Sequence, residues 1–141
     1  MTQGAIHHIE IYVADLAESE NFWGWLLESL GYTPYQKWDK GISWQLKGQY
    51  LVFVQAESQF TESGYHRKRI GLNHLAFNVE SSANVDDYKV KLEERGSRIL
   101  YLDKHPYAGG SENYAIYFED PNGIKVELVA TRAKNENEGC D

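Results

Sequence analysis

Two short segments of the chain repeat a pattern in which a histidine opens a run of alternating residues. They read "HIEIYV" from His8 and "HLAFNV" from His74. After each histidine every second residue is apolar, which is typical of a β-strand with one face on a core. Both histidines therefore lie on the face turned away from that core. Imidazoles at equivalent places in a repeat favour one shared chemical site.

A carboxylate in the last predicted strand completes a set of metal donors. Val126 and Leu128 alternate as core residues, so Glu127 lies on the opposite face. Two imidazoles and one carboxylate suit a divalent Zn, Mn, Ni or Fe ion, with positions left open for water or substrate. We therefore predict a metal site formed by His8, His74 and Glu127. For each histidine taken singly, the alternative is a hydrogen-bonded polar residue that binds no metal.

Glu10 is the candidate catalytic base. Alternation puts it on the same face as His8, and partial burial near a metal would tune its pKa for proton transfer. Two other roles stay open for this residue. It either orients a metal ligand or faces solvent at the end of the sheet.

The elements that position these residues follow one order twice: a strand, a helix and three strands. The helices are expected within 15–32 and 80–97, each closed by a glycine in the C-cap place, Gly31 or Gly96. The later strands are expected at 33–38, 42–47, 50–55, 98–102, 113–119 and 124–130. We expect one domain over 1–131, with module one at 5–57, a linker at 58–69 and module two at 70–131. A polar tail, 132–141, is expected to be disordered and holds an exposed thiol, Cys140.

Further residues are predicted to line a substrate pocket on the histidine face. Gln45 and Tyr117 fall at matching places in the repeat, where they either hydrogen-bond a bound oxyanion or form a structural pair. Phe53 takes the place in the first half that Glu127 takes in the second. Tyr107 lies in a long Gly-rich segment, 103–113, that is either a cover over the substrate or a plain connection.

Composition and net charge indicate which classes of partner the protein is expected to bind. A chain of 141 residues with 42% apolar content suits one globular domain with a core. Its net charge of −7 argues against a nucleic-acid partner. No apolar run is long enough to span a membrane and no signal peptide is recognised, so we expect a cytoplasmic protein with a small-molecule substrate. The one basic cluster, "YHRKR" at 65–69, either attracts an anionic substrate or belongs to a solvated linker.

The motifs "HHIEIYVADLAESENFW", "GLNHLAFNVES" and "YFEDPNGIKVELV" resemble those of the vicinal oxygen chelate superfamily. This superfamily includes glyoxalase I, bleomycin-resistance proteins, fosfomycin-resistance enzymes and extradiol dioxygenases. The resemblance implies an α+β fold of two tandem βαβββ modules, which form a cupped mixed sheet around a central pocket. It also implies one metal held by His8, His74 and Glu127, and a homodimer.

Departures from the family pattern leave three functions open. Glyoxalase I takes a fourth metal ligand at the place assigned here to Phe53, which cannot coordinate. Fosfomycin thiol transferases commonly carry a threonine where this chain has Glu10. The first function is a metal-dependent isomerase, lyase or thiol transferase acting on a small oxygen-rich molecule. The others are an iron-dependent ring-cleaving dioxygenase and a protein that sequesters an antibiotic or aromatic ligand.

Overall fold

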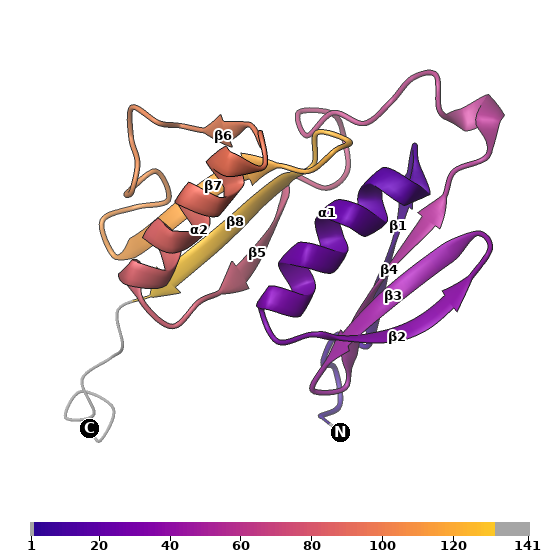
Figure 1. The fold of residues 1–141 in the computed structure, drawn as a ribbon, viewed down its shortest axis with the longest axis horizontal. Coiled ribbons are helices and arrows are strands. Elements are labelled where there is room, and N and C mark those ends of the chain that lie inside the picture. The colour runs from indigo at the N-terminus through magenta and orange to yellow at the C-terminus, as the bar shows by residue number, and fades with distance from the viewer. Residues whose placement is uncertain (1, 132–141) are drawn as a thin grey trace. The chain divides into compact units, whose positions relative to one another are not determined.

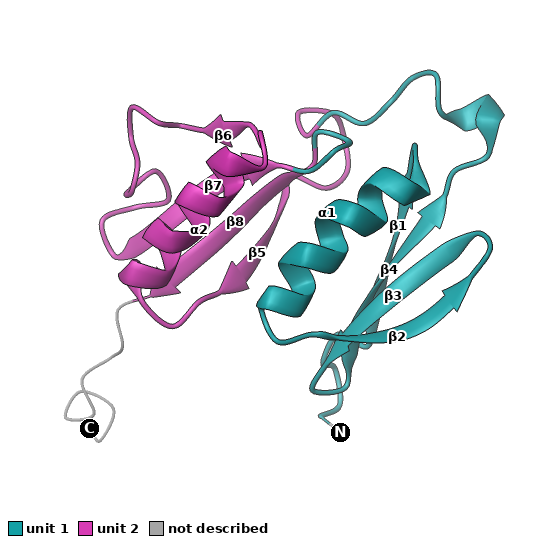
Figure 2. Cartoon of the chain, in the orientation of Figure 1, with its two compact units in different colours: residues 1–66, 120–123 teal, residues 67–119, 124–141 magenta. Residues whose placement is uncertain are grey.

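The computed structural model describes residues 2–131, so the predicted tail and Cys140 lie outside the described residues. The chain divides into two compact units (Figures 1 and 2). Among the described residues, unit 1 comprises 2–66 with Asp120–Gly123, and unit 2 comprises Arg67–Glu119 with 124–131. Each unit contains one helix and one four-stranded mixed sheet, so the predicted α+β class and the two βαβββ modules are confirmed. No helix within residues 2–131 has the length and apolar content needed to cross a membrane.

Unit 1 contains the first strand–helix–strand–strand–strand sequence. Its elements are β1 (His8–Val13), α1 (Leu16–Ser29), β2 (Thr33–Trp38), β3 (Gly41–Leu46) and β4 (Gln49–Gln55), followed by the 3₁₀ turn η1 (Ser58–Phe60). The strand order is β1-β4-β3-β2. β1 pairs parallel with β4, and the other two pairings are antiparallel.

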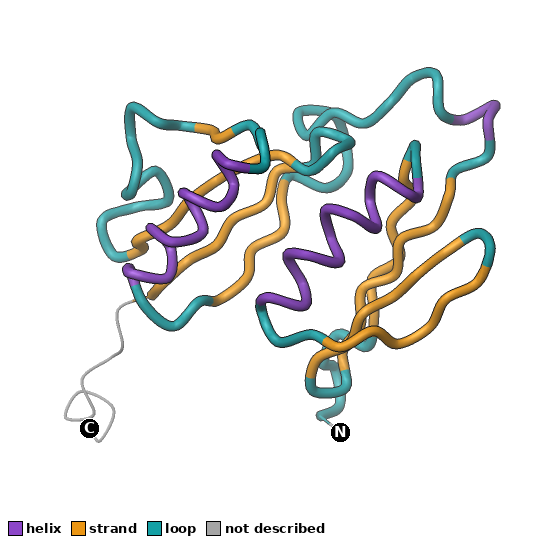
Figure 3. Tube along the Cα trace, viewed as in Figure 1, coloured by secondary structure: helices purple, strands orange, loops and turns teal. Residues whose placement is uncertain are grey.

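Unit 2 repeats this topology with different sequence. Its elements are β5 (His74–Asn78), α2 (Ser82–Glu94), β6 (Ile99–Leu100), β7 (Asn113–Glu119) and β8 (Lys125–Thr131). The strand order β5-β8-β7-β6 matches that of unit 1 strand for strand, with β5 parallel to β8. In each unit the helix packs on one face of the sheet, which leaves the histidine face without a helix (Figure 3).

Both helices end as their glycines predict. Gly31 and Gly96 have φ values of 100° and 75°, in the left-handed region that glycine adopts without steric cost. The amide of the residue after each glycine donates to a carbonyl one helical turn back, Tyr32 to Leu27 and Ser97 to Leu92, both at 2.9 Å. This is the Schellman arrangement, which satisfies carbonyls that the helix leaves free.

The core of unit 1 is built on aromatic rings between α1 and the sheet. Trp23 of α1 is fully buried and stacks on Phe53 of β4 with a centroid distance of 4.9 Å. Trp44 of β3 contacts the same ring edge-on at 6.0 Å. Phe22, Leu26 and Leu27 of α1 are also buried, whereas Trp25 is half-buried. In unit 2 the buried residues of α2 are Val85, Tyr88 and Leu92.

The turn between β7 and β8 belongs to unit 1. The Trp23 indole Nε1 donates to the buried carboxylate of Asp120 at 3.0 Å. Asn122, three residues before the start of β8, accepts from the Ala14 amide at 3.0 Å and donates to Ser19 Oγ at 3.3 Å. The "DPNG" turn thus supplies hydrogen bonds to the start of α1.

Candidate functional site

His74 and Glu127 meet on the helix-free face of unit 2. His74 Nε2 lies 3.2 Å from Glu127 Oε1, and the glutamate residue is only 8% exposed. The other ring nitrogen of His74, Nδ1, lies 2.8 Å from Asn73 Oδ1. With the Asn73 oxygen as acceptor, a neutral His74 carries its proton on Nδ1 and presents a lone pair to the carboxylate. Two electron-pair donors at this distance require a shared proton or a cation, so the donor pair fits a metal ion.

Tyr117 supplies a hydroxyl beside this pair. It is the cross-strand partner of Glu127, and its ring lies 5.9 Å from that of His74. Burial, followed by hydrogen bonding to the Glu127 carboxylate, raises the pKa of Tyr117 to about 12. The phenol therefore stays protonated at physiological pH and serves as a hydrogen-bond donor on the ligand face.

The Gly-rich segment after β6 covers part of the same face. A Cβ on Gly109 would overlap the Tyr117 hydroxyl oxygen and would lie 3.7 Å from Glu127 Oε2, so a larger residue here would require the hydroxyl or the backbone to move. The neighbouring Ala108 packs on a small cluster with Leu100, Ala115, Tyr117 and Val129. The backbone at 108–109 thus lies against the residues that form the donor pair.

Tyr107, predicted to bind substrate from this segment, lies elsewhere. Its ring contacts Tyr114 at 5.7 Å, and the Tyr114 hydroxyl donates to Asp86 of α2 at 2.6 Å. Tyr114 and Tyr117 are separated by three residues in a strand, so their side chains point to opposite faces. The prediction for Tyr107 is wrong because its ring packs on the helix side of β7.

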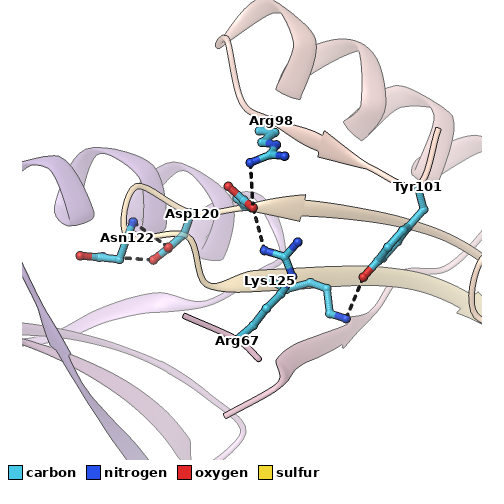
Figure 4. A network of polar contacts seen from close by, with 7 residues as sticks. Arg67, Arg98, Tyr101, Asp120, Asn122 and Lys125 are labelled. Carbon is cyan, nitrogen blue, oxygen red and sulfur yellow. Dashed lines mark hydrogen bonds and ion pairs between the residues drawn. The ribbon is translucent and has the colours of Figure 1, made fainter. Parts of the chain in front are cut away.

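A basic group that sequence reasoning missed adjoins the donor pair. Lys125 is the ladder partner of His74 and precedes Glu127 by two residues, so its side chain shares their face. Its Nζ lies 3.2 Å from the Tyr101 hydroxyl (Figure 4). Strand alternation from Glu127 could have identified Lys125. Nothing local in the sequence indicates Tyr101, which the pattern placed inside a strand at 98–102.

Tyr101 also explains why β6 is shorter than predicted. Its φ is 57°, in the left-handed region that a bulky aromatic residue rarely adopts. This conformation turns the chain out of the sheet after Leu100. The Tyr101 carbonyl then accepts from the amides of Lys104 and His105, each at 2.9 Å.

In unit 1, His8 lies on the helix-free face with an unpredicted aromatic partner. Its ring stacks on Tyr50 of β4 with a centroid distance of 4.7 Å and an interplanar angle of 4°. The neighbouring His7 contacts the same two side chains. The Nδ1 of His7 lies 2.9 Å from His8 Nδ1 and its ring contacts Tyr50 at 5.4 Å. His7 precedes β1, so strand alternation does not govern it.

Phe53 was predicted to hold the place of Glu127 in the first module, which the strand register contradicts. Glu10 of β1 opposes Val52, as Ala76 of β5 opposes Glu127. Val52 is therefore the equivalent of Glu127. Phe53 is 0% exposed and belongs to the aromatic core under α1, so it lines no substrate pocket on the histidine face.

Gln45 shares the His8 face but is not the equivalent of Tyr117. It opposes Tyr50 in the ladder, whereas Ser43 opposes Val52 as Tyr117 opposes Glu127. The predicted pairing of Gln45 with Tyr117 is therefore shifted by two residues.

Glu10 is exposed on β1, two residues from His8 and on the same face. Of the three predicted ligands, the structure brings His74 and Glu127 together in unit 2, while His8 belongs to unit 1. Within residues 2–131, no three His, Cys, Asp or Glu side chains form a cluster able to hold a metal ion.

Comparison with known proteins agrees with the repeat and the fold. Residues 5–128 match the model of the Glyoxalase/Bleomycin resistance protein/Dioxygenase superfamily. The chain is 58% identical over 125 residues to "Uncharacterized protein YqjT" of Bacillus subtilis, covering 89% of this chain and 98% of the relative. It is 29% identical over 128 residues to "Glutathione transferase FosA" of Serratia marcescens, covering 88% and 79%.

A solved structure gives the same result in three dimensions. A glyoxalase-like protein from Bacillus halodurans superposes with a TM-score of 0.89 at 55% identity, covering 91% of this chain and 96% of that one. The match to the family model extends over both modules, including the strands that carry His8, His74 and Glu127. The chain belongs to the glyoxalase/bleomycin resistance/dioxygenase superfamily.

Proposed function

We propose that this protein is a divalent-metal-dependent enzyme of the glyoxalase and fosfomycin-resistance type. Its substrate is a small oxygen-rich molecule, and its reaction is an isomerisation, a lyase reaction or a thiol transfer. The observation that carries the proposal is the approach of His74 Nε2 to Glu127 Oε1 at 3.2 Å, with the other imidazole nitrogen engaged by Asn73. Such a pair is suited to a cation between its two electron-pair donors.

His8 is the proposed third ligand, in line with its place in the repeat. A bound divalent ion of this kind acts as a Lewis acid toward substrate oxygens. The ion would be Zn, Mn, Ni or Fe, all of which accept imidazole and carboxylate ligands.

The chain's own residues take the remaining roles in this proposal. When Glu127 binds the metal, the Tyr117 hydroxyl turns its single O–H from that carboxylate to an oxygen of the substrate. Glu10, exposed on the His8 face, accepts the proton that the reaction releases. Gln45 hydrogen-bonds the substrate from the same face, and the backbone at Gly109 excludes water from Tyr117 and Glu127.

One relative favours thiol transfer within this range of reactions, although Glu10 departs from the pattern of the fosfomycin thiol transferases. The Serratia marcescens protein is named a glutathione transferase, and it aligns over 88% of this chain. The corrected register places Val52, not Phe53, at the position where glyoxalase I takes its fourth metal ligand. Val52 has no atom that can bind a metal, so this chain still differs from the four-ligand enzymes.

Metal content tests the proposal directly. We expect the purified protein to bind about one divalent ion per chain. The His74→Ala variant should lose that binding and keep the circular dichroism spectrum of the folded protein. Wild-type protein that binds none of Zn, Mn, Ni and Fe(II) at micromolar concentration would contradict the proposal and favour ligand sequestration.

An iron-dependent dioxygenase is the second candidate, because two histidines and one carboxylate also hold non-haem Fe(II). Oxygen uptake with a catechol in the Fe(II)-loaded protein would identify it.

Size-exclusion chromatography tests the accompanying proposal of a homodimer, for which we expect about twice the mass of the 16.2 kDa chain.

A further inference from the structure

A buried lysine lies on the ligand face of unit 2 and has an unusual environment. Lys125 is only 9% exposed, and long cationic side chains are rarely buried to this extent without a carboxylate partner. Its Nζ is 3.2 Å from the Tyr101 hydroxyl and lies 5.3 Å and 5.8 Å from the ring centroids of Tyr101 and Tyr117. Two aromatic rings and a phenol oxygen thus surround the ammonium group.

The nearby carboxylates are already engaged by other groups. Glu119, the ladder partner of Lys125, pairs with Arg67 at 2.8 Å and with Arg98 at 3.6 Å (Figure 4). Glu127 faces His74 and bonds to Tyr117. Arg67 and Arg98 are therefore paired with Glu119, whereas the contacts of Lys125 are with aromatic groups.

The Tyr101 hydroxyl interacts with the positive charges of Lys125 and Arg67. Hydrogen bonding from Lys125 lowers the pKa of Tyr101, and the positive charges of Lys125 and Arg67 act in the same direction against the effect of burial. An environment that favours a negative phenol oxygen also favours a negative oxygen from a ligand. Tyr101 is 38% exposed, so part of this residue is open to solvent.

The backbone of Tyr101 is strained to hold the ring at this place. A non-glycine residue at φ 57° is strained, and such positions gather at ligand-binding sites. Two amides bonded to the Tyr101 carbonyl and the lysine contact hold the residue there.

We propose that Lys125 and Tyr101, supported by the charge of Arg67, form a subsite for an oxyanion group of the substrate, either a carboxylate or a phosphorus oxyanion. The assignment of that group to the substrate rests on the function proposed above. Lys125 is one strand away from His74 and two residues from Glu127, spacings of about 4.8 Å and about 7 Å. The oxyanion therefore binds within the length of one small molecule from the proposed metal donors.

Anion titration of metal-free protein tests the subsite independently of the metal site. The probes are inorganic phosphate and acetate, added at constant ionic strength and followed by NMR of ¹³C-labelled tyrosine, with the Tyr101 signal assigned through Tyr101→Phe. We expect a saturable shift of the Tyr101 signal with one of the two anions. The anion that binds more tightly identifies the oxyanion as a phosphorus or a carboxylate group.

One variant and one matched control locate the binding. Lys125→Met should weaken anion binding by about 10-fold or more, the loss expected for a charged hydrogen bond. The control is Lys91→Met, since Lys91 also lies over a tyrosine ring, 5.6 Å from that of Tyr88 on α2. It should leave anion binding unchanged.

Thermal unfolding confirms that each variant is folded, and Lys125→Arg, which keeps the charge, should retain most of the binding. Failure of wild-type protein to bind either anion, or unchanged binding by folded Lys125→Met, would overturn the subsite. Because the assay contains no metal, that result leaves the proposed metal site intact. If His74→Ala loses metal binding and retains anion binding, the oxyanion subsite forms independently of the metal site.

Discussion

Unit 1 and unit 2 share one scaffold but differ in the strand beside the histidine. In unit 1 the ladder sets Tyr50 opposite His8 and places Val52 two residues later. In unit 2 the same two places are taken by Lys125 and Glu127. Two alternate positions on one strand thus convert an aromatic and apolar surface into a charged one. The repeat preserves the strand order and register, while the chemistry is set by a few side chains on one face.

The helix sides of the two sheets show the opposite behaviour. Both are apolar, although unit 1 buries Trp23, Trp44 and Phe53 together, whereas unit 2 buries Phe118 among aliphatic residues such as Ile116, Val126 and Leu128. Core residues can differ in shape because each sheet needs only apolar volume against its own helix. Residues on the ligand face cannot be exchanged in this way, since each supplies a particular donor or charge.

We expect the largest effect when Glu127 of β8 is replaced by valine, the residue at the equivalent position of β4. Glu127→Val should abolish metal binding, a loss beyond the roughly 10–100-fold seen when only a group that orients a ligand is removed. The pKa of Tyr117 should fall from about 12 toward its ordinary value, since hydrogen bonding to Glu127 is one of its causes. Metal analysis and phenol absorbance against pH measure the two effects. Retained stoichiometric metal would remove Glu127 from the ligand set.

The first strands differ at Glu10, whose equivalent in β5 is Ala76. Glu10→Gln should lower turnover by roughly 10²–10⁴-fold, the contribution of a positioned proton acceptor, and should leave metal affinity unchanged. Steady-state kinetics and metal titration separate these effects. A variant that loses metal affinity and recovers activity with excess metal would instead assign Glu10 to orienting a ligand.

The aromatic core of unit 1 offers a test of the corrected register. Phe53→Ala should lower the free energy of unfolding by about 3–5 kcal/mol, because it empties a fully buried site next to Trp23 and Trp44. Folded protein should still bind metal normally. A metal defect without destabilisation, measured by urea unfolding and metal titration, would return Phe53 to the ligand face.

The segment 103–113, which covers part of the ligand face of unit 2, depends on Gly109. Gly109→Ala should displace the Tyr117 hydroxyl or the backbone at 108–109 and reduce turnover by roughly 10–100-fold, as expected for a misplacement of about 1 Å. Tyr107→Phe serves as the control from the same segment, since its ring packs on Tyr114, and it should leave turnover unchanged. Equal kinetics for Gly109→Ala and wild type would show that the cover does not position Tyr117.

The smallest effect is expected from the stacked pair in unit 1. Tyr50→Leu removes the ring that lies parallel to His8 and should weaken metal binding by about 2–10-fold, the equivalent of the roughly 0.5–1.5 kcal/mol that aromatic pairs contribute. Competition with a chelator gives the affinity. The control, Tyr35→Leu, removes a neighbouring tyrosine whose ring lies 5.1 Å from Tyr50, and it should have little effect.

Much of the fold was determined by the sequence through local rules. Alternation after His8 and His74 predicted both first strands and the face on which each histidine lies, because a strand with one buried face has a period of two. The glycines at Gly31 and Gly96 predicted the helix ends, because a left-handed residue there completes the hydrogen bonds of the last turn. The equivalence of the two histidines followed from the repeat alone.

Only the tertiary structure decided which side of β4 faces the ligand surface. In "QYLVFVQ" both Val52 and Phe53 are buried, so the strand shows no alternation from which its facing can be predicted. Its register against β1 fixes the facing, since a slip of one residue would exchange the two sides. The contacts of Lys125 with Tyr101 and of Gly109 with Tyr117 were decided in the same way. They join residues from a loop and a strand that are distant in sequence, and no local periodicity encodes such an approach.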